Sequence, residues 1–316
     1  MSPPTALRPA SPLKIALAYC TCVIVWGSTW AVAKVGLEDL PPLRFVGTRM
    51  LLAGLILLPF ARSHGAVLGA RTTWRIVGLG TLQIGVPFML MFVGQQWIPS
   101  SWSALLFSTF PVWLLLVGRV LMPEQALTGH KLLAAGLGLA GVVALQHDQL
   151  GGLDVSGQAM LGCILLLSSA MLVALANVLV KQHMAHVPPH MLVFVQTLSS
   201  SLPMLALSFV LEAEAPVSWT PRALFSLVYL AVGGTVITYQ LLYWLLPRIS
   251  LTALGTMALL DTLVAVLLGV VVLREPLTVS LVVGGVLILS GAGIANFIPP
   301  DMTPAPETPL HKEKSH

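Results

Sequence analysis

The sequence predicts an all-α integral membrane protein of about ten transmembrane helices, arranged as two inverted five-helix repeats. The first supporting observation is composition, because 56% of the 316 residues are hydrophobic and only 9% are charged. A soluble domain carries about 25% charged residues. The second is that residues 76–118 contain no Asp, Glu, Lys or Arg, a length sufficient for two crossings. The third is an internal similarity between the two halves of the chain.

The predicted spans are apolar segments of roughly 20 residues, the length that crosses a bilayer. Short connections rich in Pro, Gly or charge separate them, and none is large enough for a soluble domain. The first apolar segment is longer than the core of a cleavable signal peptide, so we interpret it as a span. The Pro-rich, polar tails at 1–13 and 299–316 are predicted to be disordered. Spans are expected near residues 15–35, 43–62, 74–95, 101–121, 129–146, 157–180, 190–211, 222–246, 250–272 and 277–297.

The distribution of charge predicts that both termini are cytoplasmic. Lys and Arg are concentrated in alternate connections, and this excess marks the cytoplasmic loops of membrane proteins. The bias accounts for the net charge of +4, so no affinity for nucleic acid is inferred. Lys34, Arg44, Arg222 and Arg274 are exceptions, each close to a helix end where a long side chain can reach the interface. The outward connections are expected to carry Glu38, Asp39, Asp148, Asp154, Glu212 and Glu214.

The internal similarity divides the chain into residues 14–148 and 149–298, with a boundary near 149–157. Each half holds about five spans, and an odd number inserts the second half upside down. Such inverted repeats are a transporter architecture, with the substrate site near the midplane between the halves. The matching positions are residues 34–42 and 181–189, Gly85 and Gly234, residues 103–105 and 252–254, and Glu124 and Glu275.

Asp261 is the most informative single residue, because it lies at the centre of the apolar run 249–273. An ionised side chain at the bilayer centre costs at least ~2.5–3.5 kcal/mol, so such residues usually line a water-filled path or a ligand site. We therefore predict a transport pathway there, with a carboxylate that exchanges a proton or binds substrate. The alternative is a protonated, hydrogen-bonded packing residue.

Further polar and amphipathic side chains in the spans suit a cavity that accepts an amphipathic solute. Arg49, about two turns into the second span, either reaches the outer interface or pairs with a carboxylate or an anionic substrate group. Its counterpart in the repeat is Gln196, which is also polar, and Gln240 belongs to the same inventory. The alternative for each of these residues is a role in holding helices together. The predicted substrate-binding residues are Asp261, Trp26, Trp30, Asn177, Gln83, Tyr239, Tyr243 and Arg49.

Neither a metal site nor a cofactor is predicted. All eight histidines lie in connections, helix ends or tails. Pro188 and Pro189 would interrupt any helix between His186 and His190. The three cysteines fall inside spans, where they are expected to be small packing residues. The chain has no GxxxxGK[ST] phosphate-binding loop, so ATP is not expected to drive it.

An ordered set of motifs resembles the EamA-type members of the drug/metabolite transporter superfamily over residues 15 to 297. The family usually has a proline near the middle of the ninth span, where this chain has Thr262. The resemblance implies a ten-helix carrier in the bacterial inner membrane, often an exporter of amino acids or related solutes. The motifs are WGSTW at 26–30, Pro42 with TRMLLAG at 48–54, SALL and TFP within 103–111 before Glu124, TAL and LLD within 252–261 before REP at 274–276, and the glycine-rich last spans of both halves.

We therefore expect a secondary transporter that exports small metabolites by alternating access around a midplane cavity. The alternative is an intramembrane enzyme acting on a lipid or polyprenyl substrate, although no histidine lies at the depth of Asp261 to assist it. A channel is a further alternative that the repeat disfavours. The expected partners are a small-molecule substrate and the lipid bilayer, with protons as one option for the coupling ion. The sequence leaves the substrate, the coupling ion, the direction of flux and the oligomeric state open.

Overall fold

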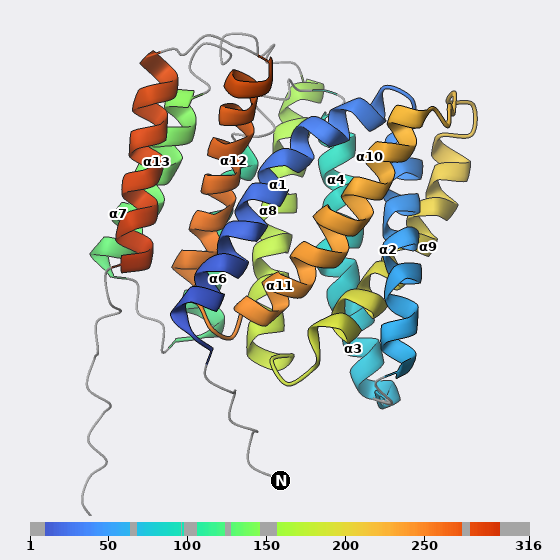
Figure 1. The fold of residues 1–316 in the computed structure, drawn as a ribbon, viewed down its shortest axis with the longest axis horizontal. Coiled ribbons are helices and arrows are strands. Elements are labelled where there is room, and N and C mark those ends of the chain that lie inside the picture. The colour runs from blue at the N-terminus through green and yellow to red at the C-terminus, as the bar shows by residue number, and fades with distance from the viewer. Residues whose placement is uncertain are drawn as a thin grey trace, which may run out of the picture.

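The computed structural model describes residues 10–63, 68–95, 97, 106–123, 128–145, 157–273 and 279–297. The two tails and the boundary expected near 149–157 lie outside these ranges. Every element in the described part is helical (Figure 1). The elements are α1 Pro12–Leu37, α2 Pro42–Ser63, α3 Ala70–Gly80, η1 Thr81–Gly85, α4 Val86–Gln95, α6 Phe110–Leu121, α7 Gly129–Leu145, α8 Gly157–His183, α9 Pro189–Leu211, α10 Pro221–Ala231, η3 Val232–Ile237, α11 Thr238–Leu245, α12 Leu251–Leu273 and α13 Val279–Phe297.

Six of these helical stretches are long and apolar enough to cross a membrane, and four shorter stretches are also apolar. The six are Pro12–Thr29, Pro42–Arg62, Ala70–Met91, Gly157–His183, Pro189–Leu211 and Pro221–Leu245. Large apolar side chains also cover the outer surface, including Trp74 at 73%, Val120 at 75% and Phe209 at 66% exposed. So much exposed apolar surface suits contact with lipid tails and not with water.

Local sequence determines where several helices begin. Ser11 caps α1 by accepting a hydrogen bond from the backbone N–H of Lys14, and Thr220 caps α10 in the same way. Proline then occupies the first helical position of α1 and α10, as it does in α2 and α9. The proline ring fixes the helical φ, and its missing N–H would be unpaired at that position in any case.

Two of the predicted spans are interrupted at their centres by short π-helical segments. The segment η1 joins α3 to α4, and η3 joins α10 to α11. The sequence predicted uninterrupted spans at 74–95 and 222–246. A π-helix shifts the hydrogen-bond register by one residue, which leaves backbone carbonyl groups available to other partners.

The helices pack as a bundle in which elements distant in sequence lie side by side. The helix α2 packs on α9 at the right side of the molecule in Figure 1, and α7 packs on α13 at its left side. The helix α1 packs on α10, α11 and α12, while α8 packs on α4 and α6. In the figure, α1 begins and α13 ends at the lower edge, so the described chain starts and finishes at one end of the bundle.

Candidate functional site

The segment η3 at the centre of the bundle accepts hydrogen bonds from two other helices. The Gly234 carbonyl oxygen accepts from Arg49 Nη2 at 3.0 Å and from Trp26 Nε1 at 3.3 Å. The hydroxyl of Thr235 accepts from Arg49 Nε at 2.9 Å. A Cβ at position 234 would lie 2.9 Å from the Thr29 methyl and 3.1 Å from Arg49 Nη2, so glycine allows this approach. The altered register of η3 thus provides the docking point for both α1 and α2.

Arg49 is buried in the bundle and does not reach the outer interface. Its side chain is 8% exposed, and its described partners, Gly234 and Thr235, are both uncharged. The described contacts therefore join α2 to η3 through neutral acceptors. A guanidinium is also the side chain that best matches the geometry of carboxylate and phosphate groups.

A row of aromatic rings leads away from Arg49. Trp26 contacts Tyr239 edge-on with ring centroids 5.8 Å apart, and Tyr239 contacts Tyr243 in the same way at 5.9 Å. The Tyr243 hydroxyl then donates a hydrogen bond to Oε1 of Gln196 on α9. Helices α1, α11 and α9 therefore form one continuous polar and aromatic row. The row connects Arg49 with Gln196, the two residues that correspond in the internal repeat.

Three buried amides in the helical spans each have one polar atom without a hydrogen-bond partner among the described residues. These atoms are Gln83 Oε1, Asn177 Oδ1 and Gln196 Nε2, and the three residues are 0–2% exposed. Gln83 belongs to η1, and Gln196 packs directly against Gly80 at the start of that segment. An unpaired buried polar atom costs about 1–3 kcal/mol, so these amides are candidates for binding a polar ligand.

Gln196 belongs with the site, although it is absent from the binding residues predicted from the sequence. The sequence feature that indicates it is its position as the counterpart of Arg49 in the internal repeat. Within the described part of the chain it is fully buried and lies between Gly80 and Tyr243. The repeat therefore pointed to it before the structure did.

Asp261 lies on α12, outside this row. Its carboxylate accepts a long hydrogen bond from the Thr262 hydroxyl at 3.4 Å, and its backbone oxygen faces Gly27 of α1 closely enough to exclude a side chain there. Asp261 takes part in none of the ion pairs among the described residues, and Arg49 bonds to η3 instead. The structure therefore does not bring Asp261 and Arg49 together. Trp30 lies in α1, but its side chain is outside the described part.

The described residues contain a pocket of about 610 Å³ at the upper end of the bundle, away from the aromatic row. It is lined by residues 37–42 and 210–216. The described residues contain no group of three or more His, Cys, Asp and Glu side chains that could hold a metal ion. The chemistry available at the bundle centre is thus hydrogen bonding, one buried cation and aromatic surface.

Comparison with known proteins agrees with this arrangement. The model of the EamA-like transporter family matches residues 13–145 and 160–297. The chain belongs to the EamA-like transporter family. It is accordingly a multi-pass membrane protein whose relatives are named as transporters.

Two relatives cover almost all of this EamA-like transporter. "Uncharacterized transporter YoaV" of Bacillus subtilis is 24% identical, with 90% of this chain and 97% of the relative aligned. "Probable amino-acid metabolite efflux pump" of Escherichia coli is 29% identical, with 87% and 92% aligned. A solved crystal structure with 19% identity superposes with a TM-score of 0.79 over 91% of this chain and 98% of the other, which shows the shared fold.

Proposed function

We propose that this protein is a secondary transporter that exports small amphipathic metabolites, such as amino acids or related solutes, across the cytoplasmic membrane. The observation that carries the proposal is the row from Arg49 through Trp26, Tyr239 and Tyr243 to Gln196. It combines a charged group, aromatic faces and unpaired amides at the centre of an apolar bundle. The relative in Escherichia coli whose name refers to amino-acid metabolite efflux supports the solute class.

We further propose ten spans in two inverted repeats. The exchange of helix contacts between the halves supports a two-fold relation between them. Helix α1 of the first half packs on α10, α11 and α12, and its counterpart α8 packs on α4 and α6. The pairs α2–α9 and α7–α13 each join a helix to its own counterpart. The π-segments η1 and η3 fall in matching spans, and the family match also divides into two segments.

The proposed orientation has both termini in the cytoplasm. The Lys and Arg bias of alternate connections supports it. The start of α1 and the end of α13 lie at the same end of the bundle in Figure 1, which is compatible with an even number of spans. The upper end of Figure 1, where α1 and α9 end, is then the outer end. Glu38, Asp39 and Glu212 directly follow these two helices.

In this proposal a solute binds with its anionic group toward Arg49 and its apolar part along the aromatic row. The amides Gln83, Asn177 and Gln196 would pair with further polar groups of the solute, which would relieve the cost of their unpaired atoms. Asp261 acts separately, either by exchanging a proton or by attracting an ammonium group. Alternating access then needs the halves to move relative to one another around this row.

Efflux of labelled solutes from proteoliposomes tests the proposal. We expect the wild type to move a subset of amino acids or related solutes, and Asp261→Asn to abolish transport or remove its pH dependence while folding normally. Glu214→Gln removes the same charge from an exposed loop residue, so it should transport as the wild type does. Chemical conversion of a lipid substrate without solute movement would instead favour the intramembrane enzyme. Transport by Asp261→Asn at the wild-type rate and pH dependence would assign this residue to packing.

A further inference from the structure

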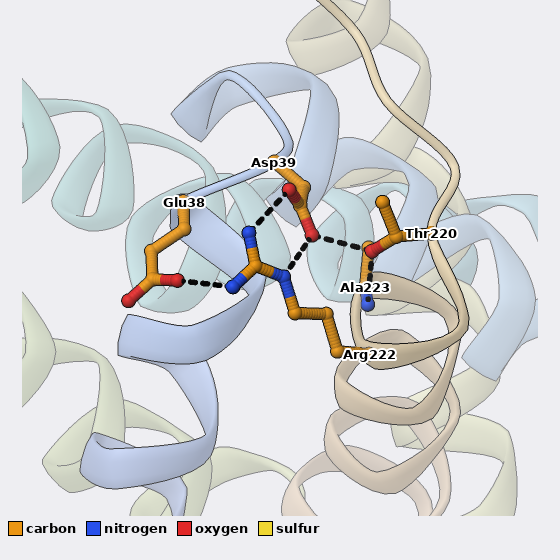
Figure 2. Close-up of polar contacts among 5 residues, drawn as sticks. All are labelled: Glu38, Asp39, Thr220, Arg222 and Ala223. Carbon is orange, nitrogen blue, oxygen red and sulfur yellow. Dashed lines mark hydrogen bonds and ion pairs between the residues drawn. The ribbon is translucent and has the colours of Figure 1, made fainter.

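A compact network of charges joins the two halves at the upper end of the bundle. Figure 2 shows Arg222, at the start of α10, reaching the loop that follows α1. Its Nε and Nη2 donate to the two carboxylate oxygens of Asp39 at 2.7 and 2.8 Å, and its Nη1 donates to Glu38 at 2.7 Å. The hydroxyl of Thr220 donates to Asp39 as well. We call these four residues the Arg222 latch.

The latch is better formed than an ordinary surface ion pair. Its Arg222–Asp39 contact is bidentate, which fixes geometry as well as charge. The Asp39 side chain is only 8% exposed although it lies in a connection, and its backbone oxygen also accepts from the Ser218 N–H at 2.9 Å. The arginine itself is 54% exposed, so the latch remains open to water on one side. Breaking the latch therefore leaves the arginine in contact with water.

A second tie lies beside the latch and joins the same parts of the chain. The Glu212 carboxylate accepts from the backbone N–H groups of Leu43 and Arg44 at 2.8 and 3.0 Å, at the start of α2. A carboxylate at a helix N-terminus complements the helix dipole. Arg44 in turn donates to the Ser208 hydroxyl at 3.0 Å. Together the two ties hold the α1–α2 connection against the end of α9 and the start of α10.

The internal repeat does not reproduce the latch at the lower end. The two latch carboxylates correspond to Ala185 and His186, and Arg222 corresponds to Arg71, the second residue of α3 as Arg222 is of α10. Residues 62–71, which correspond to the segment before Arg222, contain no carboxylate. A histidine and an arginine cannot form an attractive ion pair. The fold is therefore similar in its two halves, but the charges that join them differ between its two ends.

Uncharged acceptors hold the lower end instead. Lys181, near the end of α8, donates to the backbone oxygens of Leu246 and Ile249 after α11. The neighbouring Gln182 donates to the backbone oxygen of Leu121 at 3.0 Å. A hydrogen bond with an ionised partner is about twice as strong as a neutral one, and a bidentate arginine–carboxylate pair adds geometric specificity. Lys181 bonds within the second half, and Gln182–Leu121 joins the two halves through neutral groups, so the ion pair that joins the halves among the described residues is the one at the upper end.

We propose that the Arg222 latch is the outer gate of the transporter, and that it holds the outer end closed while the inner end opens to load solute. This proposal rests on the proposed function and orientation. Release to the outside requires α1 and α2 to separate from α9 and α10, which breaks the latch. A gate that is tighter outside than inside keeps the empty transporter available to cytoplasmic solute, as an exporter needs.

A reporter cysteine below the latch tests the gate without measuring transport. Ser28 of α1 suits this purpose, because its hydroxyl lies 2.6 Å from the Tyr229 hydroxyl of α10 and is partly buried between these helices. In protein whose three native cysteines are alanine, Ser28→Cys is labelled by an impermeant thiol reagent from outside. We expect Arg222→Gln and Asp39→Asn each to raise the labelling rate about two- to five-fold, the effect of removing a partly exposed ion pair. Arg222→Lys should lie between these variants and the parent.

Glu214→Gln is the matched control, because it removes an exposed carboxylate at the same end without touching the latch. It should leave labelling unchanged. Unchanged labelling in folded Arg222→Gln and Asp39→Asn would overturn the outer gate. A second measurement joins Glu38→Cys to Arg222→Cys with a short reducible crosslinker, which should stop efflux until the link is reduced. Efflux at the normal rate through the linked protein also contradicts the gate, whereas labelling changes in a protein that never transports would contradict only the proposed function.

Discussion

Replacement of Gly141 by alanine is expected to destabilise the protein by forcing α7 away from α13. These two helices lie side by side at one edge of the bundle (Figure 1) and join the last described helix of each half. A Cβ at position 141 would lie 2.7 Å from the Gly284 backbone oxygen and 2.9 Å from the Ile288 backbone nitrogen. Ordinary contact begins at 3.4 Å. The helices must therefore separate locally by about 0.5–0.7 Å, which forfeits a quarter or more of the dispersion energy of the pairs involved.

The expected cost is about 1–3 kcal/mol, the usual range for an added methyl group in a well-packed interior. Gly136→Ala is the matched control, since it adds the same methyl group to the same helix where nothing lies within 4 Å. The gain in helix propensity of alanine over glycine is common to both variants, so it cancels in their difference. Reversible unfolding in detergent or bicelles measures the two free energies. Equal stabilities for the two variants would refute the close α7–α13 approach.

Two further predictions follow from buried and paired polar groups. Gln83→Leu removes an amide whose Oε1 is buried without a partner in the described structure. Thermal stability should therefore stay the same or rise, while the transport rate should fall. A loss of stability with an unchanged transport rate would assign Gln83 a structural role. Hydrogen bonds from Arg222 and Thr220 lower the pKa of Asp39 to about 2. A carboxylate with a lowered pKa keeps its stabilising contribution above its ordinary pKa and loses it only as the pH falls through the lowered value. The labelling ratio of Arg222→Gln to its parent should therefore stay constant between pH 8 and pH 6, and a ratio that approached one in this window would contradict the ionised latch.

Composition and the length of apolar runs predict an all-helical membrane protein, and for several spans the predicted boundaries agree with the helices. The span predicted at 190–211 is the helix Pro189–Leu211, and the span predicted at 43–62 is Pro42–Ser63. The π-segments could not be predicted in this way, because a glycine-containing apolar run satisfies an α-helix equally well. Their register is set by side chains from other helices, such as Arg49 on the Gly234 carbonyl. Such contacts join residues about 185 positions apart and leave no local signal.

The same limit explains why the sequence left the charged residues near helix ends unresolved. The sequence predicts that Arg222 reaches the interface, and in the structure this residue instead pairs with Glu38 and Asp39 after α1. Arg44 likewise bonds to Ser208 on another helix. Position along a span determines the depth of a residue in the membrane. The partner at that depth depends on which helices become neighbours.

The outer latch and the central row are carried by the same two elements, and this provides a physical route between them. Helix α1 bears Trp26 and ends just before Asp39, while α10 begins with Arg222 and continues into η3 with Gly234. Separation of α1 from α10 must therefore break both the latch and the Trp26–Gly234 hydrogen bond. In the proposed function, a solute N–H or O–H group that donates to the Gly234 carbonyl oxygen in place of Trp26 would weaken the inner of these two contacts and leave the latch to resist opening alone. Solute binding and outer opening are then coupled by the free energy of that shared contact, and linkage requires the reverse effect: opening the latch must change solute affinity by the same factor.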